Sequence, residues 1–417
     1  MTRATFMLLL MCLVLPPGAA AAAPVVPGHQ KFLDSESIEV KKLTGRLPHN
    51  INDPVWKNVR PVSVPVYVQH SVRLNDLKAN AHAEVRSPKE VMVRAAMNDG
   101  EIAVLLEWFD LSEDRSPPDA TDVFGDAAAL QLPQRFGKGI RLPYIGMGDI
   151  DQPVYVAMQR AMTERRKSGV SEVNRLSEYV AAGFGSLTRT PLGWMKMGMD
   201  WDPGRRAWRA LFIRSLATNV GSTGSDLRKG LVPISFAIWD GARHQRGGNK
   251  LLAPWRFLRL PAFPVDPAYV AELAFGYGPS DLGDAQRGKP LVDNICSACH
   301  RLPGRQNAPD GLAPDLTNIG GIASVAYLRD SIVDPSSVVV PGLGHGRHYN
   351  KAAAPDAFKA YPNNEAFIWF SADPKTGKRT SKMPSFGGLP QEQLADMLAY
   401  LKTLGADPAP TPSTAAK

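Results

Sequence analysis

The sequence predicts a chain of two folded parts, a β-sandwich with a helical insertion followed by an all-α domain. Three observations predict this architecture. Up to residue 262, short apolar runs recur around turn-forming sequences, which is typical of a β-sandwich. A segment rich in proline and glycine follows at residues 263–283. Beyond it, apolar residues recur every three to four positions, the spacing of α-helices with one buried face.

The N-terminus predicts export from the cytoplasm. Arg3 precedes an apolar run, and an alanine-rich stretch ending at residue 23 follows it, as in secretory signal peptides. The apolar run is shorter than the roughly 20 residues that a membrane-spanning helix needs. We therefore expect residues 1–23 to be a cleaved signal peptide. The mature chain should then lie in the periplasm and have no transmembrane segment.

The first folded part is expected at residues 28–262. Apolar runs flank an Asn-Asp-Gly turn at 98–100 and an Asp-Pro-Gly turn at 202–204, and both patterns predict β-hairpins. The apolar run at 231–241 predicts a further strand. Residues 153–185 instead show helical periodicity, and this segment is the predicted helical insertion.

The second folded part is expected at residues 284–405, after a linker at 263–283. One helix should lead into residue 295, a second should be stopped by Pro335, and an amphipathic third should cover 389–404. The tail, residues 406–417, is small, polar and proline-rich, and we expect it to be disordered.

A haem-attachment motif opens the second part. Residues 296–300 read Cys-x-x-Cys-His, the signature of covalent c-type haem. We expect Cys296 and Cys299 to form the thioether bonds and His300 to be the proximal iron ligand. A zinc site is the alternative, but it needs four ligands, and no second cysteine pair remains once the signal peptide is removed.

Helices around this motif, with a methionine on a loop before the last helix, resemble class I cytochrome c over residues 281–405. The resemblance implies that Met383 is the sixth iron ligand, and Pro384 would stiffen its loop. A thioether ligand favours Fe(II) and raises the reduction potential. His345 and His348 remain alternative ligands. Met397 lies on the apolar stripe of the last helix, which indicates core packing.

Three motifs of the first part occur in a familiar order: "DVFGDAAALQLP" (122–133), "MGDIDQPV" (147–154) and "SFAIWDGARHQRGGNKLLAPWRFLRL" (235–260). They resemble the haem b-binding gamma subunits of ethylbenzene and dimethylsulfide dehydrogenases, chlorate and selenate reductases, and nitrite oxidoreductase. The resemblance spans about residues 40–262. It implies a β-sandwich that holds one non-covalent haem b between an axial methionine, here Met147, and an axial lysine, here Lys250.

The chemistry of this ligand pair is plausible. A ligating lysine must be a neutral amine, and burial beside iron lowers its pKa. The glycines on either side of Met147 would let the backbone approach a flat macrocycle closely. Competing candidates are His244 and the methionines of 195–199, whose alternation is typical of a strand with one buried face.

Composition narrows the possible functions. The formal net charge of +8 is modest for this length, so nucleic acid is not an expected partner. Basic side chains gather around Met383, where the exposed haem edge lies in cytochromes c of this class, and we expect them to steer an acidic redox partner. They are Lys375, Lys378, Arg379 and Lys382.

No catalytic constellation is visible in the sequence, and neither expected haem keeps an open iron position.

We therefore expect an electron-transfer subunit rather than an enzyme. By resemblance, it would relay electrons between the iron–sulfur and molybdopterin subunits of an oxidoreductase and a soluble cytochrome or terminal oxidase, in a direction that the sequence leaves open. The alternative is a ligand- or carbohydrate-binding β-sandwich module fused to a monohaem cytochrome c, because carbohydrate-binding domains share the sandwich topology.

Overall fold

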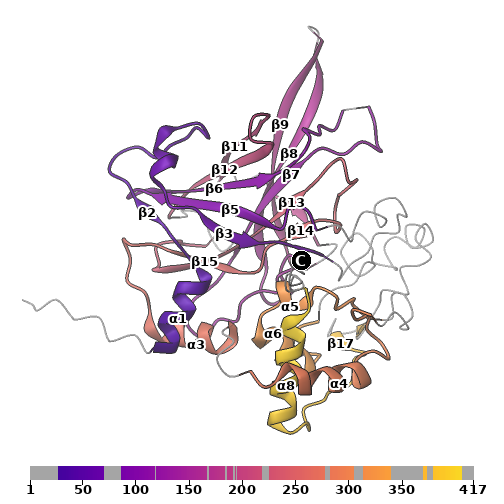
Figure 1. The fold of residues 1–417 in the computed structure, drawn as a ribbon. Coiled ribbons are helices and arrows are strands. Elements are labelled where there is room, and N and C mark those ends of the chain that lie inside the picture. Colours follow the sequence, from indigo (N-terminus) through magenta and orange to yellow (C-terminus); the bar gives the residue numbers. More distant parts are fainter. Residues whose placement is uncertain are drawn as a thin grey trace, which may run out of the picture.

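The computed structural model describes most of the chain between residues 27 and 405 (Figure 1). The described ranges are 27–69, 86–117, 119–166, 169–183, 186–190, 193, 195–217, 225–277, 282–304, 313–339, 370–372 and 379–405. The expected signal peptide and C-terminal tail lie outside these ranges. So do His345, His348, Lys375 and Lys378.

The first part of the chain forms two packed β-sheets, as predicted (Figure 1). The nine strands of the larger sheet are β1 (Ser37–Glu39), β4 (Tyr67–Val68), β7 (Ala127–Pro133), β8 (Val154–Arg166), β9 (Gly169–Ala181), β10 (Thr188–Arg189), β13 (Leu231–Trp239), β14 (Leu251–Leu252) and β15 (Arg256–Arg259). Its order is β1–β15–β13–β7–β8–β9–β10, with β14 paired to β13 and β4 to β14.

The smaller sheet has six strands in the order β11–β12–β6–β5–β2, with β3 paired to β5. They are β2 (Lys41–Lys42), β3 (Val62–Pro65), β5 (Glu90–Met97), β6 (Glu101–Phe109), β11 (Met195–Asp202) and β12 (Ala207–Ser215). The predicted hairpin turns join β5 to β6 and β11 to β12. Oδ1 of Asn98 accepts from the Gly100 and Glu101 amides, and Oδ1 of Asp202 accepts from Gly204 and Arg205.

The predicted helical insertion at 153–185 is wrong, because this segment forms the long β8–β9 hairpin. At its base, Val154 to Ala157 are buried on both faces of the sheet, a burial that suits β-branched and aromatic side chains. The other end of the hairpin projects beyond the neighbouring strands (Figure 1), since β7 pairs only with residues 154–160 of β8. The charged sequence of this projection lacks the alternation of a half-buried strand, which explains the misleading periodicity.

The two faces of the larger sheet belong to different clusters of buried apolar side chains. On the inner face, Leu130 and Phe236 pack in the sandwich core. On the outer face, Ala127, Ala129 and Ala237 border a second cluster that continues into the helical part of the chain. We call this second group of side chains the outer cluster. The central strands β7 and β13 are therefore buried on both faces.

The second part of the chain is mainly helical and lies at one end of the sandwich (Figure 1). Its helices are α4 (Ala285–Ile295), α5 (Ile319–Ile322), α6 (Val325–Val333) and α8 (Gln391–Thr403). Helices α4 and α8 cross closely at Gly288, where an added Cβ would lie 1.9 Å from the Asp396 carbonyl oxygen. Met397 is fully buried, as expected. The expectation of an all-α domain is wrong in one detail, because β16 (Phe370–Ala372) and β17 (Arg379–Ser381) form a two-stranded ladder there.

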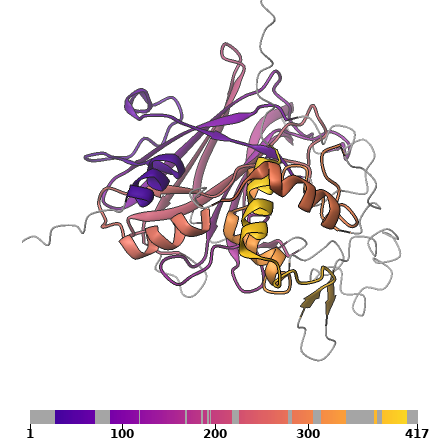
Figure 2. The ribbon, with the colours of Figure 1, turned by 60° about the horizontal axis from the view of Figure 1, so that its bottom comes forward.

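Three further helical elements were not predicted. They are α1 (Pro27–Glu36), the 3-10 helix η1 (Pro54–Asn58) and α3 (Pro267–Tyr277). Helix α3 occupies half of the segment expected to be a linker, and it buries Tyr269, Val270 and Leu273. Helices α1 and α3 lie side by side in Figure 2. No helix in the described ranges is long and apolar enough to cross a membrane.

Candidate functional site

The Cys-x-x-Cys-His motif forms a single turn at the end of α4. Asp284 caps the helix by accepting from the Gln286 and Arg287 amides, and the helix then runs into Cys296. The amides of Cys299 and His300 both donate to the Cys296 carbonyl, at 3.1 and 2.9 Å. This turn places two thiols and one imidazole within five consecutive residues. Cys296 is buried and Cys299 is exposed, and both are free thiols.

The imidazole of His300 is held in one tautomer. Its Nδ1 lies 2.7 Å from the Pro314 carbonyl oxygen, which can only accept, so Nδ1 carries the proton. Nε2 is then left with a lone pair, the form that ligates iron. Burial lowers the pKa of His300, which favours this neutral ring. Sequence reasoning did not identify Pro314, because its distance of 14 residues from the motif gives no local signal.

Met383 follows β17 and reaches the outer cluster that also contains Cys296. The Met383 amide donates to Ser381 Oγ at 3.1 Å, and the Ser381 amide donates to Ser336 Oγ at 3.1 Å. These bonds anchor the methionine loop to the turn after α6. A restrained loop favours Met383 as the sixth ligand, and this assignment stays a prediction.

Lys250 is buried on the outer face of the larger sheet. The residue is 4% exposed, and its Nζ lies 5.5 Å from the centre of the Trp239 ring. The register of β13 against β14 places these two residues opposite each other, one position beyond the Ile238–Leu251 pair. Burial lowers the pKa of Lys250 to about 8, which brings the neutral amine within reach near neutral pH.

Met147 has a left-handed backbone conformation, with φ of 71°, and packs against the same outer cluster as Trp239. Such a conformation costs a non-glycine residue about 1–3 kcal/mol, so neighbouring contacts must hold it in place. The Gly148 amide donates to the Tyr144 carbonyl, and the Gly183 amide donates to the Met147 carbonyl, both at 2.8 Å. A Cβ on Gly148 would lie 2.8 Å from the Gln152 carbonyl oxygen, so the turn accepts only glycine there.

The competing ligands lie in other surroundings. His244 is half-buried in the turn after β13, where its ring makes an edge contact with Phe124 at 6.2 Å between centroids. Met195 and Met199 are buried in the sandwich core, on the other side of the larger sheet from Lys250. The expectation that the methionines of 195–199 form a strand with a buried face is thus confirmed.

The outer face fits a haem b by the chemistry of its donors. A thioether from Met147 and an amine from Lys250 both border one apolar cluster, and burial favours the neutral amine. The sheet contributes the short side chains of Ala127, Ala129 and Ala237 to this cluster, and short side chains suit a flat ligand. The assignment of this ligand pair nevertheless rests on the resemblance and stays a prediction.

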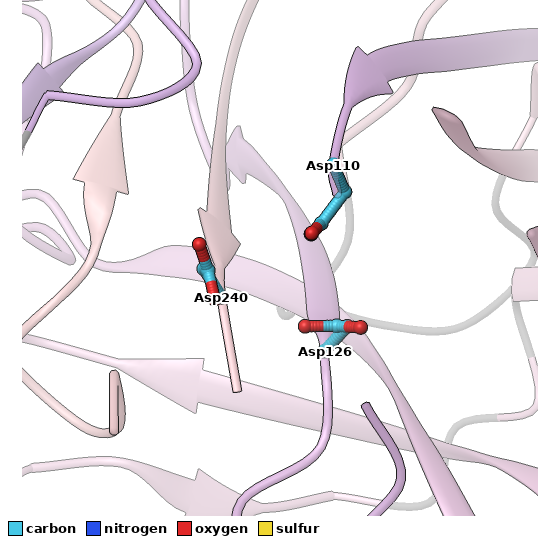
Figure 3. Close-up of side chains that lie close together, drawn as sticks. All are labelled: Asp110, Asp126 and Asp240. Atoms are coloured by element: carbon cyan, nitrogen blue, oxygen red, sulfur yellow. The ribbon is translucent and has the colours of Figure 1, made fainter. Parts of the chain in front are cut away.

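A cluster of three buried or half-buried carboxylates lies at the ends of the strands (Figure 3). Asp110 follows β6, Asp126 precedes β7 and Asp240 follows β13, and their oxygens lie within 4.8 Å of one another. Burial and mutual repulsion raise the pKa of Asp110 to about 8, and burial raises that of Asp126 to about 7. In the described ranges, only this group combines three side chains able to share a metal ion.

The carboxylate cluster also has a structural role. Asp126 accepts from the Gly241 amide at 2.8 Å, the Asp114 amide at 2.7 Å and Trp208 Nε1 at 2.7 Å. Trp208 belongs to the smaller sheet, so these bonds join the two sheets. The cluster was not predicted, since its members are separated by 16 and 114 residues (126 − 110 and 240 − 126) in the sequence. The signal that could have identified the cluster is the position of all three carboxylates at the ends of strands.

Comparisons with known proteins give a family match and several similar proteins. Residues 285–405 match the family described as cytochrome c. Three curated relatives each align with about three fifths of the chain. The putative respiratory nitrate reductase heme subunit ORF7 of Haloferax mediterranei is 27% identical over 259 residues, 62% of this chain and 84% of the relative. The dimethylsulfide dehydrogenase subunit gamma of Rhodovulum sulfidophilum is 24% identical (58% and 91%). The chlorate reductase subunit gamma of Ideonella dechloratans is 27% identical (58% and 90%).

Among solved structures, a family 9 carbohydrate-binding module from Caldicellulosiruptor kristjanssonii aligns with 55% of this chain and 98% of its own, at 10% identity and a TM-score of 0.29. The relatives and the family match confirm both resemblances drawn from the sequence motifs. The chain combines a part similar to the gamma subunits of molybdoenzymes with a cytochrome c domain.

Proposed function

We propose that this relative of molybdoenzyme gamma subunits is a periplasmic dihaem electron-transfer subunit. It relays electrons between the iron–sulfur and molybdopterin subunits of an oxidoreductase and a soluble cytochrome or terminal oxidase. The observation that carries the proposal is the buried Lys250 on the outer face of the sandwich, across one apolar cluster from the Cys-x-x-Cys-His turn of the cytochrome c domain.

Each proposed haem has two ligands from this chain. Cys296 and Cys299 would anchor haem c covalently, with its iron between His300 and a methionine of the loop after β17, Met383. A non-covalent haem b would lie between Met147 and Lys250. When bound, each iron carries one electron by alternating between Fe(II) and Fe(III). With both axial positions filled, electron transfer is favoured over chemistry on a substrate.

The surroundings of the haem b ligands support such a role. The apolar burial of Lys250 excludes water and favours the amine form that can ligate. The backbone of Met147 is fixed by hydrogen bonds before any ligand arrives, so little ordering is required on binding. Both ligands border the cluster that the cytochrome c domain shares, so the two haems would lie in one continuous packed unit.

A pyridine haemochrome assay on purified full-length protein tests the proposal. We expect equal amounts of b and c haem after expression with ample haem. A double Cys296→Ala, Cys299→Ala variant should lose haem c from the chain and keep haem b. A Lys250→Ala variant should keep haem c and leave any retained haem b five-coordinate and high-spin. Wild-type protein with haem c alone would refute the dihaem proposal and favour the binding-module alternative.

A further inference from the structure

Gln69 carries a buried amide whose two polar atoms have no hydrogen-bond partner. The residue is 2% exposed, and neither Oε1 nor Nε2 has a partner in the described part of the chain. Buried polar groups in native proteins are nearly always paired, so an exception indicates a missing partner or a functional role. Gln69 follows β4, the short strand at the edge of the larger sheet.

The strand register places this amide beside Lys250. Val68 pairs with Leu251, and the Gln69 amide donates to the Lys250 carbonyl at 3.1 Å, so Gln69 and Lys250 are opposed in the antiparallel ladder. Side chains at opposed positions project from the same face, with Cβ atoms about 4.5–5.5 Å apart. Two residues before Gln69, Tyr67 packs against the outer cluster, which identifies that face as the proposed haem b side.

Lys250 also has an opposed residue on its other side in the sheet. Because Ile238 pairs with Leu251, Trp239 lies opposite Lys250 on its other side. Trp239 at the end of β13, Lys250 just before β14 and Gln69 just after β4 are therefore neighbours at the ends of three adjacent strands. Trp239 offers an aromatic face to the amine, whereas Gln69 offers a hydrogen-bond acceptor.

We propose that Gln69 is a positioning residue for haem b, and that its Oε1 accepts a hydrogen bond from the Lys250 amine when this amine ligates the iron. A neutral amine that donates its lone pair to a metal still has two N–H groups that need acceptors in a buried site. An acceptor there orients the lone pair and makes the nitrogen a stronger donor, as outer-shell acceptors do for ligating histidines. This inference rests on the proposed haem b site.

The test compares two Gln69 variants with a matched control in full-length, haem-loaded protein. Gln69→Leu removes the acceptor, and Gln69→Glu keeps an acceptor oxygen at the same place. The control is Gln159→Leu. Gln159 is 3% exposed and has an unpartnered Oε1, but it lies on the β8 face that carries Tyr155 and Ala157 into the sandwich core.

Two readouts report on the bond between Lys250 and iron. In Gln69→Leu, the imidazole concentration that half-displaces the lysine from ferric haem b should fall about tenfold, the lower end of typical outer-shell effects. The haem b potential should rise by about 59 mV if the affinity of Lys250 for ferric iron falls tenfold relative to its affinity for ferrous iron, because a tenfold ratio corresponds to 59 mV in a one-electron couple. Gln69→Glu should stay within about twofold of wild type in imidazole titration, and Gln159→Leu should change neither readout.

Melting temperatures separate this role from a purely structural one. Without haem b, Gln69→Leu should be at least as stable as wild type, because it removes an unpaired buried amide. A structural amide would instead lower the melting temperature with and without haem b. An unchanged imidazole titration and potential in Gln69→Leu, or a tenfold drop in Gln69→Glu, would overturn the inference while the dihaem proposal survives. Absence of haem b from the wild type would refute both.

Discussion

Replacing Lys250 by methionine should stabilise the protein that lacks haem b. Burial lowers the pKa of Lys250 from 10.5 to about 8, so at pH 7 this form must still hold an ammonium group away from water. The shift corresponds to about 3 kcal/mol, at about 1.4 kcal/mol for each pKa unit. Methionine has a similar length and no charge. Lys250→Met should therefore gain up to about 3 kcal/mol in free energy of unfolding at pH 7.

The sign of the pH dependence follows from the lowered pKa. Between about pH 8 and 10.5 the folded chain has released this proton and the unfolded chain still holds it, so wild-type stability rises with pH there. The advantage of the variant should accordingly shrink over that window and vanish above it. Burial lowers the pKa of Lys402 to about 8 as well, but this group adds the same slope to both proteins. The difference between the two proteins isolates Lys250.

Thermal melts followed by circular dichroism measure the effect. Acid–butanone extraction removes non-covalent haem and leaves thioether-linked haem c in place. For a domain of 150–250 residues, about 3 kcal/mol shifts the midpoint by about 6–12 °C. Lys196→Met, at a largely exposed lysine of the smaller sheet, is the control and should change little. A haem b-free Lys250→Met protein that melts at or below the wild-type temperature at pH 7 would refute the reasoning.

Three further changes test other parts of the molecule. Met383→Ala should keep haem c attached, lower its potential and open the iron to carbon monoxide; an unchanged potential would assign the ligand role to another side chain. Charge reversal at Lys378 and Arg379 should slow electron transfer to an acidic partner at low salt, and a rate unaffected by both salt and charge would exclude docking there. Asp110 keeps its proton up to about pH 8 in the folded chain, whereas the unfolded chain loses this proton above about pH 4. The free energy of unfolding should therefore fall by about 2 kcal/mol between pH 6 and 8. In thermal melts with EDTA present, Asp110→Asn should abolish this decrease of stability with pH, whereas Asp99→Asn should leave it unchanged.

The parts of the fold that were predictable are those fixed by neighbouring residues. The turn at 98–100 and the turn at 202–204 are closed by side chains within the turn itself, so the sequence contains the whole interaction. The β8–β9 hairpin was not predictable in this way. Its base is flanked within the sheet by β7 and β10 and is buried on its two faces by two different apolar clusters, and this environment exists only in the folded sheet.

The candidate site also combines local features, which could be predicted, with tertiary contacts, which could not. The Cys-x-x-Cys-His motif is local, and its ligand roles could be read from five consecutive residues. Met147 and Lys250 were identified only through the resemblance, because no spacing rule connects residues so far apart. The bond of His300 to the Pro314 carbonyl and the pairing of Gln69 with Lys250 depend on tertiary contacts, for which composition and periodicity hold no signal.

The short strand β4 connects the two candidate haem sites. Gln69 lies beside the proposed ligand Lys250, and the adjacent Val68 carbonyl accepts from Asn318 Nδ2 of the cytochrome c domain at 3.0 Å. Next to it, the Tyr67 ring lies so close to α5 that a Cβ on Gly321 would come within 2.5 Å of its carbons. Three consecutive residues thus contact the haem b side and the cytochrome c domain at once. These contacts are a hydrogen bond and close packing rather than a flexible tether, so we expect that movement of the domains does not limit electron transfer between the two proposed haems.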